Sequence, residues 1–403
     1  MFRTKCMVCQ SDNLQTIIDL GMHPFADTFV VPERESEPDL LYQLACDLCS
    51  ECGHIQSRCM TDPTARYSDH AYSYTSSNSA FSRAHWERYA ADVAKKNEVG
   101  PDDLVIEIGS NDGYLLEQFR NNGAKVLGID AAPAVAEIAN KRGVETLVGL
   151  FDLELAETVK ADVGPAKLVV ANNVFNHADD VVSFAKAAAS LLAPEGVFVF
   201  ELPYWCIGIR DGHIDQIYHE HVSYLTATAS NQIAQAAGLT VSAIEVVDYH
   251  GGSLRVSARL SDGASTILPD LERMIEQEQR DRMFEPAMYE EFMLGIEKRR
   301  NQFLRNLYTL KEEGVPVVGV GAAAKGNTIL NYYGLDHTVI DYVTDSSPHK
   351  QGKLTPGTRI PICDDQVFAE YSNVAALILS WNLADTLKKV LLEINPRVEF
   401  LSP

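Results

Sequence analysis

One segment sets the architecture of the chain, and it reads Leu104-Val105-Ile106-Glu107-Ile108-Gly109-Ser110-Asn111-Asp112-Gly113-Tyr114. The run from Leu104 to Ile108 is apolar apart from one acid, which predicts a buried strand of a parallel sheet. Two glycines bracket the next turn, and Leu115, Leu116 and Phe119 then recur at helical spacing. The segment therefore predicts a strand, a glycine turn and a helix, as in a Rossmann-like α/β domain.

The turn is acidic, which bears on the ligand it binds. A dinucleotide site uses G-x-G-x-x-G to seat a pyrophosphate, but here Glu107 and Asp112 would repel one. A second apolar run ends in Asp130, where an acid can bond both hydroxyls of a ribose. S-adenosylmethionine suits these groups, because it carries a sulfonium, an ammonium and a ribose but no phosphate. A structural βαβ unit with incidental acids is the alternative.

A further apolar strand, residues 166–170, is followed by Asn172 and Asn173. Ligands bind at the carboxyl edge of a parallel sheet, so both amides are candidate contacts, with ordinary turn formation as the alternative. The predicted cofactor-binding residues are Glu107, Gly109, Asn111, Asp112, Gly113, Asp130, Asn172 and Asn173.

Length and charge narrow the classes of function. A chain of 403 residues predicts two or three domains, and a net charge of -22 argues against nucleic-acid or anionic-membrane binding. The N-terminus has no apolar region typical of a signal peptide, and no apolar run reaches membrane-spanning length. Most of the eight cysteines lie in the first 60 residues at metal-like spacing, which favours a reducing cytoplasm. The sequence leaves the oligomeric state open, and a monomer is compatible with it.

Two C-x-x-C pairs, Cys6 with Cys9 and Cys49 with Cys52, predict a structural zinc site of four thiolates. Cys46 also lies three residues before Cys49, so the register of the second pair is ambiguous. We prefer Cys49 with Cys52, because Gly53 relaxes the backbone just after the second ligand. A redox pair is the alternative.

Hydroxyl and amide side chains crowd the stretch from residue 67 to residue 86, which includes Tyr72 and Tyr74. Such residues would line a polar substrate pocket, or they would form a solvated linker; the sequence favours neither.

The segment Gln216-Ile217-Tyr218-His219-Glu220-His221-Val222-Ser223-Tyr224 is the strongest candidate for the chemistry. In an extended strand His219 and His221 would face one way, and Tyr218 and Glu220 the other. All four would reach one site only if the segment crosses the pocket in an irregular turn. A histidine there would act as a base near neutral pH. A hydrogen-bonded core cluster and a His-x-His metal pair are the alternatives.

The last third of the chain begins with charged helical segments and then repeats the strand–glycine–helix pattern. Residues 316–328 contain Gly319, Gly321 and Lys325, with no acid in the turn, and such a helix start favours a phosphate. Loops at 345–353 and 356–361 add further basic groups. The chain therefore carries two Rossmann-like units, the first suited to a cation and the second to an anion.

Taken together, these motifs resemble the S-adenosylmethionine-dependent sugar C-methyltransferases of deoxysugar biosynthesis. The resemblance covers nearly the whole chain and rests on five motifs in order, although the extra Cys46 leaves the zinc register less certain. The motifs are the paired cysteines, residues 107–113, Tyr218-His219-Glu220-His221, residues 319–327 and residues 345–352.

The family implies three domains: a zinc-binding and substrate-lid domain at 1–75, a methyltransferase domain at 76–262, and a helical bridge with a nucleotide-sugar domain at 263–403. It implies C-methylation of a nucleotide-diphosphate keto-deoxysugar next to its ketone, through an enolate. By resemblance His221 is the general base, with Tyr218 and Glu220 near the sugar. The chemistry also needs a donor to stabilise the enolate oxygen, for which His219 and Tyr218 are the candidates. The residues implied to hold substrate are Tyr72, Tyr74, Lys325, Asn327, Asp345, Lys350 and Arg359.

Three other functions fit parts of the sequence. The first is O- or N-methylation of a nucleotide-sugar. The second is a non-catalytic protein that senses nucleotide-sugar or S-adenosylmethionine, which leaves residues 218–221 without a purpose. The third is a nicotinamide oxidoreductase that uses the turn at Gly319–Gly326, where only Asp341 or Asp345 would supply the acid that such a site needs.

Overall fold

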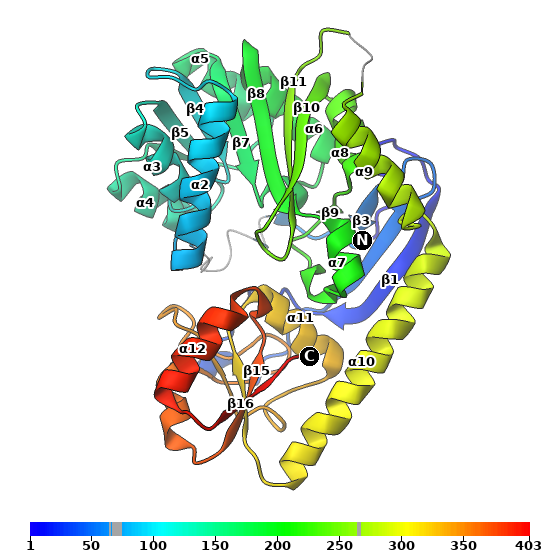
Figure 1. The fold of residues 1–403 in the computed structure, drawn as a ribbon, viewed down its shortest axis with the longest axis vertical. Coiled ribbons are helices and arrows are strands. Elements are labelled where there is room, and N and C mark those ends of the chain that lie inside the picture. Colours follow the sequence, from blue (N-terminus) through cyan, green and yellow to red (C-terminus); the bar gives the residue numbers. More distant parts are fainter. Residues whose placement is uncertain (64–65, 67–74, 264–266) are drawn as a thin grey trace.

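The structure is a computed structural model that describes residues 1–63, 66, 75–263 and 267–403. Its described residues form three sheets, of four, seven and five strands. Figure 1 shows the seven-stranded central domain above the C-terminal domain, with the long helix α10 running beside both and the N-terminal sheet at their junction. The predicted α/β class, with a small N-terminal module and two Rossmann-like units, is confirmed.

The N-terminal module is an antiparallel sheet in the order β1-β2-β3-β9. Its core consists of apolar side chains that alternate along the strands, such as Ile18, Leu20, Leu44 and Leu48. Three of its strands come from the first 60 residues, but the fourth comes from the middle of the chain. Their bounds are β1 Leu14–His23, β2 Tyr42–Cys49, β3 Ile55–Ser57 and β9 Ser223–Tyr224.

The central sheet has the order β10-β11-β8-β7-β4-β5-β6. The strands from β8 to β6 run parallel, whereas β11 and β10 are antiparallel to their neighbours. The strands are β4 Leu104–Ile108, β5 Lys125–Asp130, β6 Thr146–Val148, β7 Ala166–Asn172, β8 Leu192–Pro203, β10 Leu239–Val247 and β11 Ser253–Leu260.

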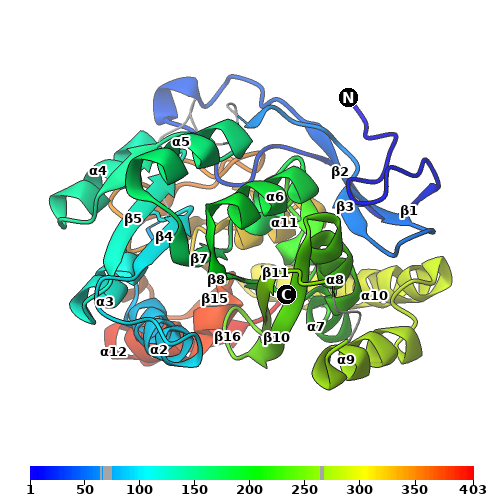
Figure 2. The same cartoon turned by 90° about the horizontal axis from the view of Figure 1, so that it is seen from above.

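Helices cover both faces of this sheet (Figure 2), and side-chain caps fix where several of them start. Ser79, Asp152, Asp180 and Thr226 each accept a hydrogen bond from a backbone N–H three residues later. The helices are α2 Ala80–Lys96, α3 Tyr114–Asn121, α4 Pro133–Lys141, α5 Leu153–Val163, α6 Val181–Leu191, α7 Trp205–Asp211 and α8 Ala227–Ala236. Short 3-10 turns follow β7 and α7, at η2 Phe175–His177 and η3 Ile214–Gln216.

Two helices, α9 Pro269–Arg280 and α10 Pro286–Glu312, form the predicted bridge. Each has a proline in its first turn, where the missing N–H costs no hydrogen bond. Gly314, just beyond α10, has a φ of 76°. The buried residues of α10 recur at helical spacing and join both large cores, which explains why the helix lies along the two domains.

The C-terminal domain has a parallel sheet in the order β14-β13-β12-β15-β16, with α11 and α12 as its main helices. The elements are β12 Val317–Val320, α11 Ala324–Tyr333, β13 Tyr342–Thr344, β14 Ile362–Cys363, η4 Asp365–Glu370, β15 Val374–Ile378, η5 Trp381–Leu383, α12 Ala384–Ile394 and β16 Val398–Leu401. The second strand–glycine–helix unit is therefore present as predicted.

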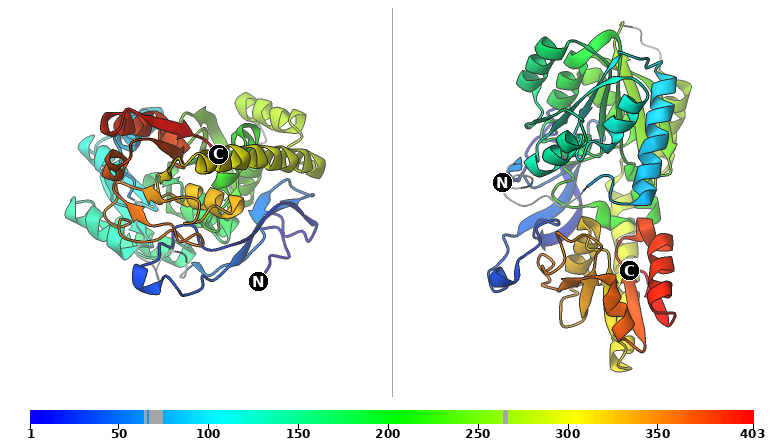
Figure 3. Two further views of the ribbon diagram at one scale, coloured as in Figure 1. Left: turned by 90° about the horizontal axis from the view of Figure 1, so that it is seen from below. Right: turned by 90° about the vertical axis from the view of Figure 1, so that its left-hand side faces the viewer.

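Residues 24–39, which include η1 (Pro32–Arg34), leave the N-terminal sheet and lie against the C-terminal domain; we call them the strap. Val30 and Leu354 exchange two backbone hydrogen bonds of 2.9 and 2.7 Å. Figure 3 shows the dark blue strap beside the orange loops of the C-terminal domain. Within the described part of the chain, no helix has the length and apolar character needed to cross a membrane.

Candidate active site

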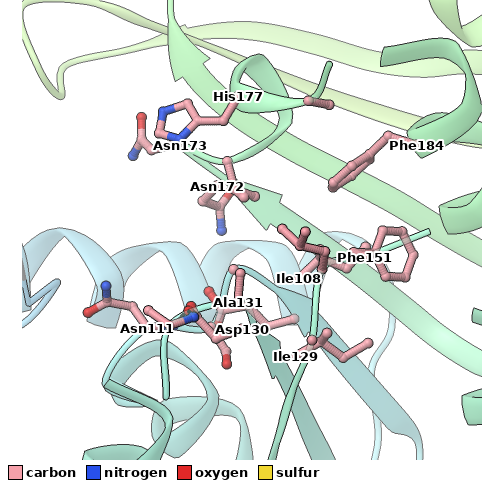
Figure 4. A pocket seen from close by; sticks show the side chains of 18 of the residues that line it. Ile108, Asn111, Ile129, Asp130, Ala131, Phe151, Asn172, Asn173, His177 and Phe184 are labelled. Atoms are coloured by element: carbon pink, nitrogen blue, oxygen red, sulfur yellow. Dashed lines mark hydrogen bonds between the residues drawn. The ribbon is translucent and has the colours of Figure 1, made fainter. Parts of the chain in front are cut away.

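A cavity of about 360 Å³ opens at the carboxyl edge of the central sheet, where the sequence predicted a ligand site. Figure 4 shows its walls, with the aromatic rings of Phe151 and Phe184 on one side and the amides of Asn111, Asn172 and Asn173 on the other. Of the eight predicted cofactor residues, six line it: Glu107, Gly109, Asn111, Asp130, Asn172 and Asn173.

Glu107 and Asn172 bring unsatisfied polar atoms to this cavity. Among the described residues, Glu107 Oε2 and both side-chain atoms of Asn172 have no hydrogen-bond partner. Burial raises the pKa of Glu107 well above its ordinary value, and the carboxylates of Asp112 and Asp130 raise it further. Because a buried carboxylate is costly without a partner, this wall suits a ligand that carries positive charge.

Asp130 is held in place by the turn that the glycines make. Its carboxylate accepts hydrogen bonds of 2.8 Å from the Asn111 and Ala132 backbone N–H groups. Burial raises the pKa of Asp130, and these two bonds oppose that shift. Gly109 allows the turn, since its φ is 71° and a Cβ there would lie 2.8 Å from Val174 Cβ.

Asp112 and Gly113 do not line the cavity. The Asp112 carboxylate accepts from the hydroxyls of Ser76, at 2.6 Å, and Ser77, and lies 3.5 Å from an Arg142 nitrogen. Gly113 packs against Ala139, where a Cβ would lie 2.9 Å from the alanine Cβ. Both residues thus shape the turn, and their predicted contact with the cofactor stays a prediction.

The segment with Tyr218 and His221 is an irregular turn and not an extended strand, which is the condition predicted from the sequence for its side chains to reach one site. The backbone N–H of His221 donates to the backbone carbonyl of Tyr218 at 2.9 Å, which closes the turn. The Tyr218 ring packs on the His221 ring, with their centroids 3.9 Å apart. His221 Nδ1 lies 2.7 Å from the Gln216 carbonyl oxygen, which only accepts, so Nδ1 carries the proton and Nε2 is left as the basic atom.

His221 is neutral at physiological pH, because burial first and the neighbouring His177 second hold its pKa well below the usual value. The His177 ring lies 5.2 Å from the His221 ring and also lines the cavity. We did not nominate His177 from the sequence. The signal was present, since it follows Asn172 and Asn173 at the same sheet edge.

His219 and Glu220 are buried in surroundings that differ from those of His221. The His219 ring makes edge contacts with Phe25 and Tyr42 of the N-terminal module, at 5.6 and 5.8 Å between centroids. Burial lowers the pKa of His219 to about 4. Glu220 is also buried, and burial with the charge of Asp27 raises its pKa to about 7. Glu220 is therefore partly protonated at neutral pH and able to donate a hydrogen bond.

Lys325 reaches the same region from the C-terminal domain. Its ammonium is buried, has no hydrogen-bond partner within the described chain, and lies 4.9 Å from the centre of the Trp381 ring. Burial lowers the pKa of Lys325, and the charge of Asp215 opposes that shift. One turn further along α11, Thr328 donates to the Ile217 carbonyl at 3.1 Å, so the helix docks beside the Tyr218–His221 turn. A buried cation without a partner suits an anionic ligand.

The other predicted substrate residues have partners within the protein. Asn327 Nδ2 donates to the Ala26 carbonyl of the strap at 2.6 Å, and Lys350 Nζ donates to the Ala322 carbonyl at 2.6 Å. Arg359 bonds three groups of the strap: the Asp39 carboxylate at 2.6 Å and the carbonyls of Glu35 and Glu37. The Asn327 and Arg359 contacts join modules, whereas the Lys350 bond lies within the C-terminal domain. Substrate binding by these three residues stays a prediction.

Asp345 makes the second unit more like the first than the sequence suggested. Its carboxylate accepts from the Ala322 and Ser347 N–H groups at 2.9 and 2.8 Å, as that of Asp130 does from its own turn. The turn at residues 321–326 contains no acid itself, but the carboxylate of Asp345 lies against it from the end of β13. Lys350 lies 3.6 Å from the same carboxylate and offsets its charge.

The four cysteines of the predicted metal site meet in space. The sulfurs of Cys6, Cys9, Cys49 and Cys52 all lie within 4.8 Å of one another. Cys46 is instead fully buried in the core of the N-terminal sheet, so Cys49 begins the second pair. Four sulfurs at this spacing fit the tetrahedral coordination that zinc prefers. Tyr72 and Tyr74 lie outside the described residues.

Comparisons with known proteins match this division of the chain. Family models match residues 6–67 as a zinc binding domain, 81–244 as a methyltransferase domain and 248–397 as a C-methyltransferase C-terminal domain. The C-methyltransferase NovU of Streptomyces niveus is 31% identical over 380 residues, which cover 94% of this chain and 90% of NovU. The chain belongs to this C-methyltransferase family.

Two more distant similarities cover the central part of this C-methyltransferase. A ubiquinone biosynthesis O-methyltransferase from Methylobacterium sp. (strain 4-46) is 28% identical over 178 residues, 40% of this chain and 72% of that protein. The magnesium protoporphyrin IX methyltransferase of Synechocystis PCC 6803 has a TM-score of 0.36 and 16% identity, over 44% of this chain and 83% of that one. A TM-score this low supports no conclusion of its own.

The two cofactors predicted from the sequence, S-adenosylmethionine and zinc, are confirmed for this enzyme by its family. The cavity fits the methyl donor, because Glu107 with its unpartnered oxygen, the fixed Asp130 and aromatic rings all line it. The four-sulfur cluster fits the zinc ion.

Proposed function

We propose that this methyltransferase acts on a nucleotide-diphosphate keto-deoxysugar and methylates the carbon next to its ketone through an enolate. The observation that carries the proposal is the place of His221. Its tautomer is fixed by Gln216, and its ring adjoins His177 on the cofactor cavity. A base at this point suits the removal of a proton from carbon, the step that C-methylation of a ketone needs.

The proposed reaction needs a base, a hydrogen-bond donor to the enolate oxygen and a methyl donor. His221 Nε2 takes the proton from the α carbon, and the electrons of that C–H bond form the enolate with the ketone oxygen as its anionic end. The Tyr218 hydroxyl or protonated Glu220 donates to that oxygen. When bound, S-adenosylmethionine would supply an electrophilic methyl group, whose bond to sulfur would break to leave a neutral thioether as the enolate carbon takes the methyl.

The second Rossmann-like unit binds the substrate at a point away from the reacting carbon. The buried, unpartnered Lys325 suits an oxygen of the diphosphate. Remote binding energy of this kind orients the sugar and contributes to the rate. We also propose a reducing cytoplasm as the compartment, because four zinc-binding thiols need one.

The test is turnover of a 4-keto-6-deoxy nucleotide-sugar with S-adenosylmethionine, with the methylated atom located by NMR. We expect a new carbon–carbon bond, and exchange of the α hydrogen with deuterated solvent when the methyl donor is left out. His221→Asn should lose both reactions by about a hundredfold or more while its affinity for S-adenosylmethionine stays within a factor of about three.

The matched control is His337→Asn, an exposed histidine of the C-terminal domain, which should behave as wild type. A methyl group found on oxygen or nitrogen would contradict the carbon chemistry. If His221→Asn exchanged the α hydrogen of the sugar at a near-normal rate, His221 would not be the general base.

A further inference from the structure

The strand that follows the catalytic turn belongs to the zinc-binding module. β9 begins two residues after His221, and it pairs only with β3 at the edge of the N-terminal sheet. In this pairing Ile55 lies opposite Tyr224 and Gln56 opposite Ser223. The Ser57 N–H also donates to the Val222 carbonyl at 2.8 Å. Figure 1 shows β3 and β9 side by side, at the junction of the central domain and the N-terminal sheet.

The same strand β3 is tied to both cysteine pairs. It starts three residues after Cys52, and the Cys49 N–H donates to the His54 carbonyl at 2.9 Å. Gln56 makes the link to the first pair: its Oε1 accepts from the Met7 N–H at 2.8 Å, and its Nε2 donates to the Lys5 carbonyl at 3.0 Å. Gln56 is fully buried, so no water replaces these bonds.

The C-terminal end of the catalytic turn continues directly into β9. β9 contains two residues, which is too short to be stable without its partner. On the other side the Val222 N–H donates to the Asn176 carbonyl at 2.9 Å, next to His177. The turn is thus held between the zinc-binding module and the wall of the cofactor cavity. A shift of β3 would move His221 relative to the cavity.

We propose that Gln56 is a positioning residue for catalysis, through which the zinc-bound cysteine pairs fix β3, β9 and the turn that carries His221. It acts through this backbone and does not touch the substrate. The inference rests on the proposed role of His221. Because a misplacement of about 1 Å can cost about a hundredfold in rate, a modest loosening of β9 should be visible in kcat.

The experiment compares Gln56→Leu with Gln43→Leu in the full-length, zinc-loaded enzyme. Leucine keeps most of the volume of glutamine but removes both hydrogen bonds. Gln43 is the matched control, since it lies on β2 of the same sheet and its side chain donates only to the exposed Asp19 carboxylate. The readouts are zinc content, affinity for S-adenosylmethionine, kcat, KM and hydrogen exchange of the amides of residues 221–224.

We expect Gln56→Leu to keep its zinc and to bind S-adenosylmethionine within a factor of about three of wild type. Its amides at 221–224 should exchange at least about tenfold faster, and kcat should fall by about tenfold or more with KM little changed. Gln43→Leu should match wild type in every readout. Unchanged exchange at 221–224, or a parallel loss of S-adenosylmethionine affinity, would overturn the proposal.

A second measurement covers the case in which Gln56→Leu does not fold. In wild-type enzyme, removal of zinc by a chelator should speed exchange at 221–224 while S-adenosylmethionine still binds, and added zinc should reverse the change. Loss of S-adenosylmethionine binding together with zinc would show a global role and overturn the inference. Amide hydrogen exchange needs no sugar substrate. Its result therefore does not depend on whether the proposed sugar C-methylation is correct.

Discussion

Glu107 is the residue whose environment differs most from that of an ordinary acid. It is buried at the cavity wall, it has no partner for Oε2 among the described residues, and two other carboxylates raise its pKa further. In the unliganded enzyme this favours the neutral form. The sulfonium and ammonium of S-adenosylmethionine favour the ionised form instead, so binding of the methyl donor should release a proton.

The sign of the pH effect follows from the raised pKa. A carboxyl group whose folded pKa lies above its unfolded value stabilises the fold at low pH, and this contribution is lost as pH rises through the folded pKa. Thermal stabilisation of wild type by S-adenosylmethionine should therefore grow with pH. Glu107→Gln should bind the methyl donor about tenfold more weakly, with a stabilisation that no longer depends on pH.

Differential scanning fluorimetry across the neutral range, with and without S-adenosylmethionine, measures this difference. Glu145→Gln, an exposed acid of the same domain, is the control and should follow wild type. If Glu107→Gln bound the methyl donor as tightly as wild type does, Glu107 would not face its positive charge.

At the scale of single elements, the turn between β10 and β11 is one place where the central and C-terminal domains meet. Trp381, the first residue of η5, stacks on His213 with ring centroids 3.8 Å apart, and its Nε1 donates to Asp215 at 2.5 Å. Its outer edge lies against Gly251. The indole of Trp381 is thus enclosed by groups of the central domain. The same ring lies 4.9 Å from the Lys325 ammonium.

Gly251→Ala should disturb this contact. Its φ is 81°, and an added Cβ would lie 2.6 Å from Trp381 Cζ3. Gly238→Ala is the matched control, because Gly238 has a similar φ of 74° but nothing within 4 Å. Backbone strain alone should cost each variant about 1 kcal/mol, and overlap should cost Gly251→Ala about 1–3 kcal/mol more. Chemical unfolding measures the loss in the free energy of unfolding for each variant. Equal losses would show that Trp381 moves aside freely.

At the scale of the whole molecule, the N-terminal module contacts both other domains. Its sheet includes β9, and its strap packs on the C-terminal domain through the Val30–Leu354 pair and Arg359. The cofactor cavity, by contrast, is lined mainly by residues of the central domain. Binding of the methyl donor and placement of the substrate should therefore respond separately to mutations between modules.

Arg359→Met tests this separation. The variant removes three hydrogen bonds to the strap but leaves the cavity intact, so the strap should be cut faster by trypsin or chymotrypsin. S-adenosylmethionine affinity should stay within about threefold of wild type, whereas KM for the nucleotide-sugar should rise. Arg397→Met is the control, since that side chain reaches only the exposed Ser372 carbonyl. Equal protease sensitivity of the two variants would contradict the role of the strap.

The sequence by itself determined the elements whose signals are local. Hydrophobic runs that end in glycine turns predict β4 and β12 with their helices, and cysteine spacing predicts the zinc-binding pairs, because neighbours in the chain set these patterns. It also nominated candidate site residues, at Glu107, Asp130 and Tyr218–His221, whose roles stay predictions.

Only the tertiary structure decided which of these side chains meet. It separates His219 from His221, brings His177 and Lys325 beside the catalytic turn, and uses Arg359 to join modules. It also adds a strand of the central region to the zinc-binding sheet. The physical reason is that side-chain direction in an irregular turn, and packing between segments hundreds of residues apart, depend on the whole fold and leave no periodic trace in the sequence.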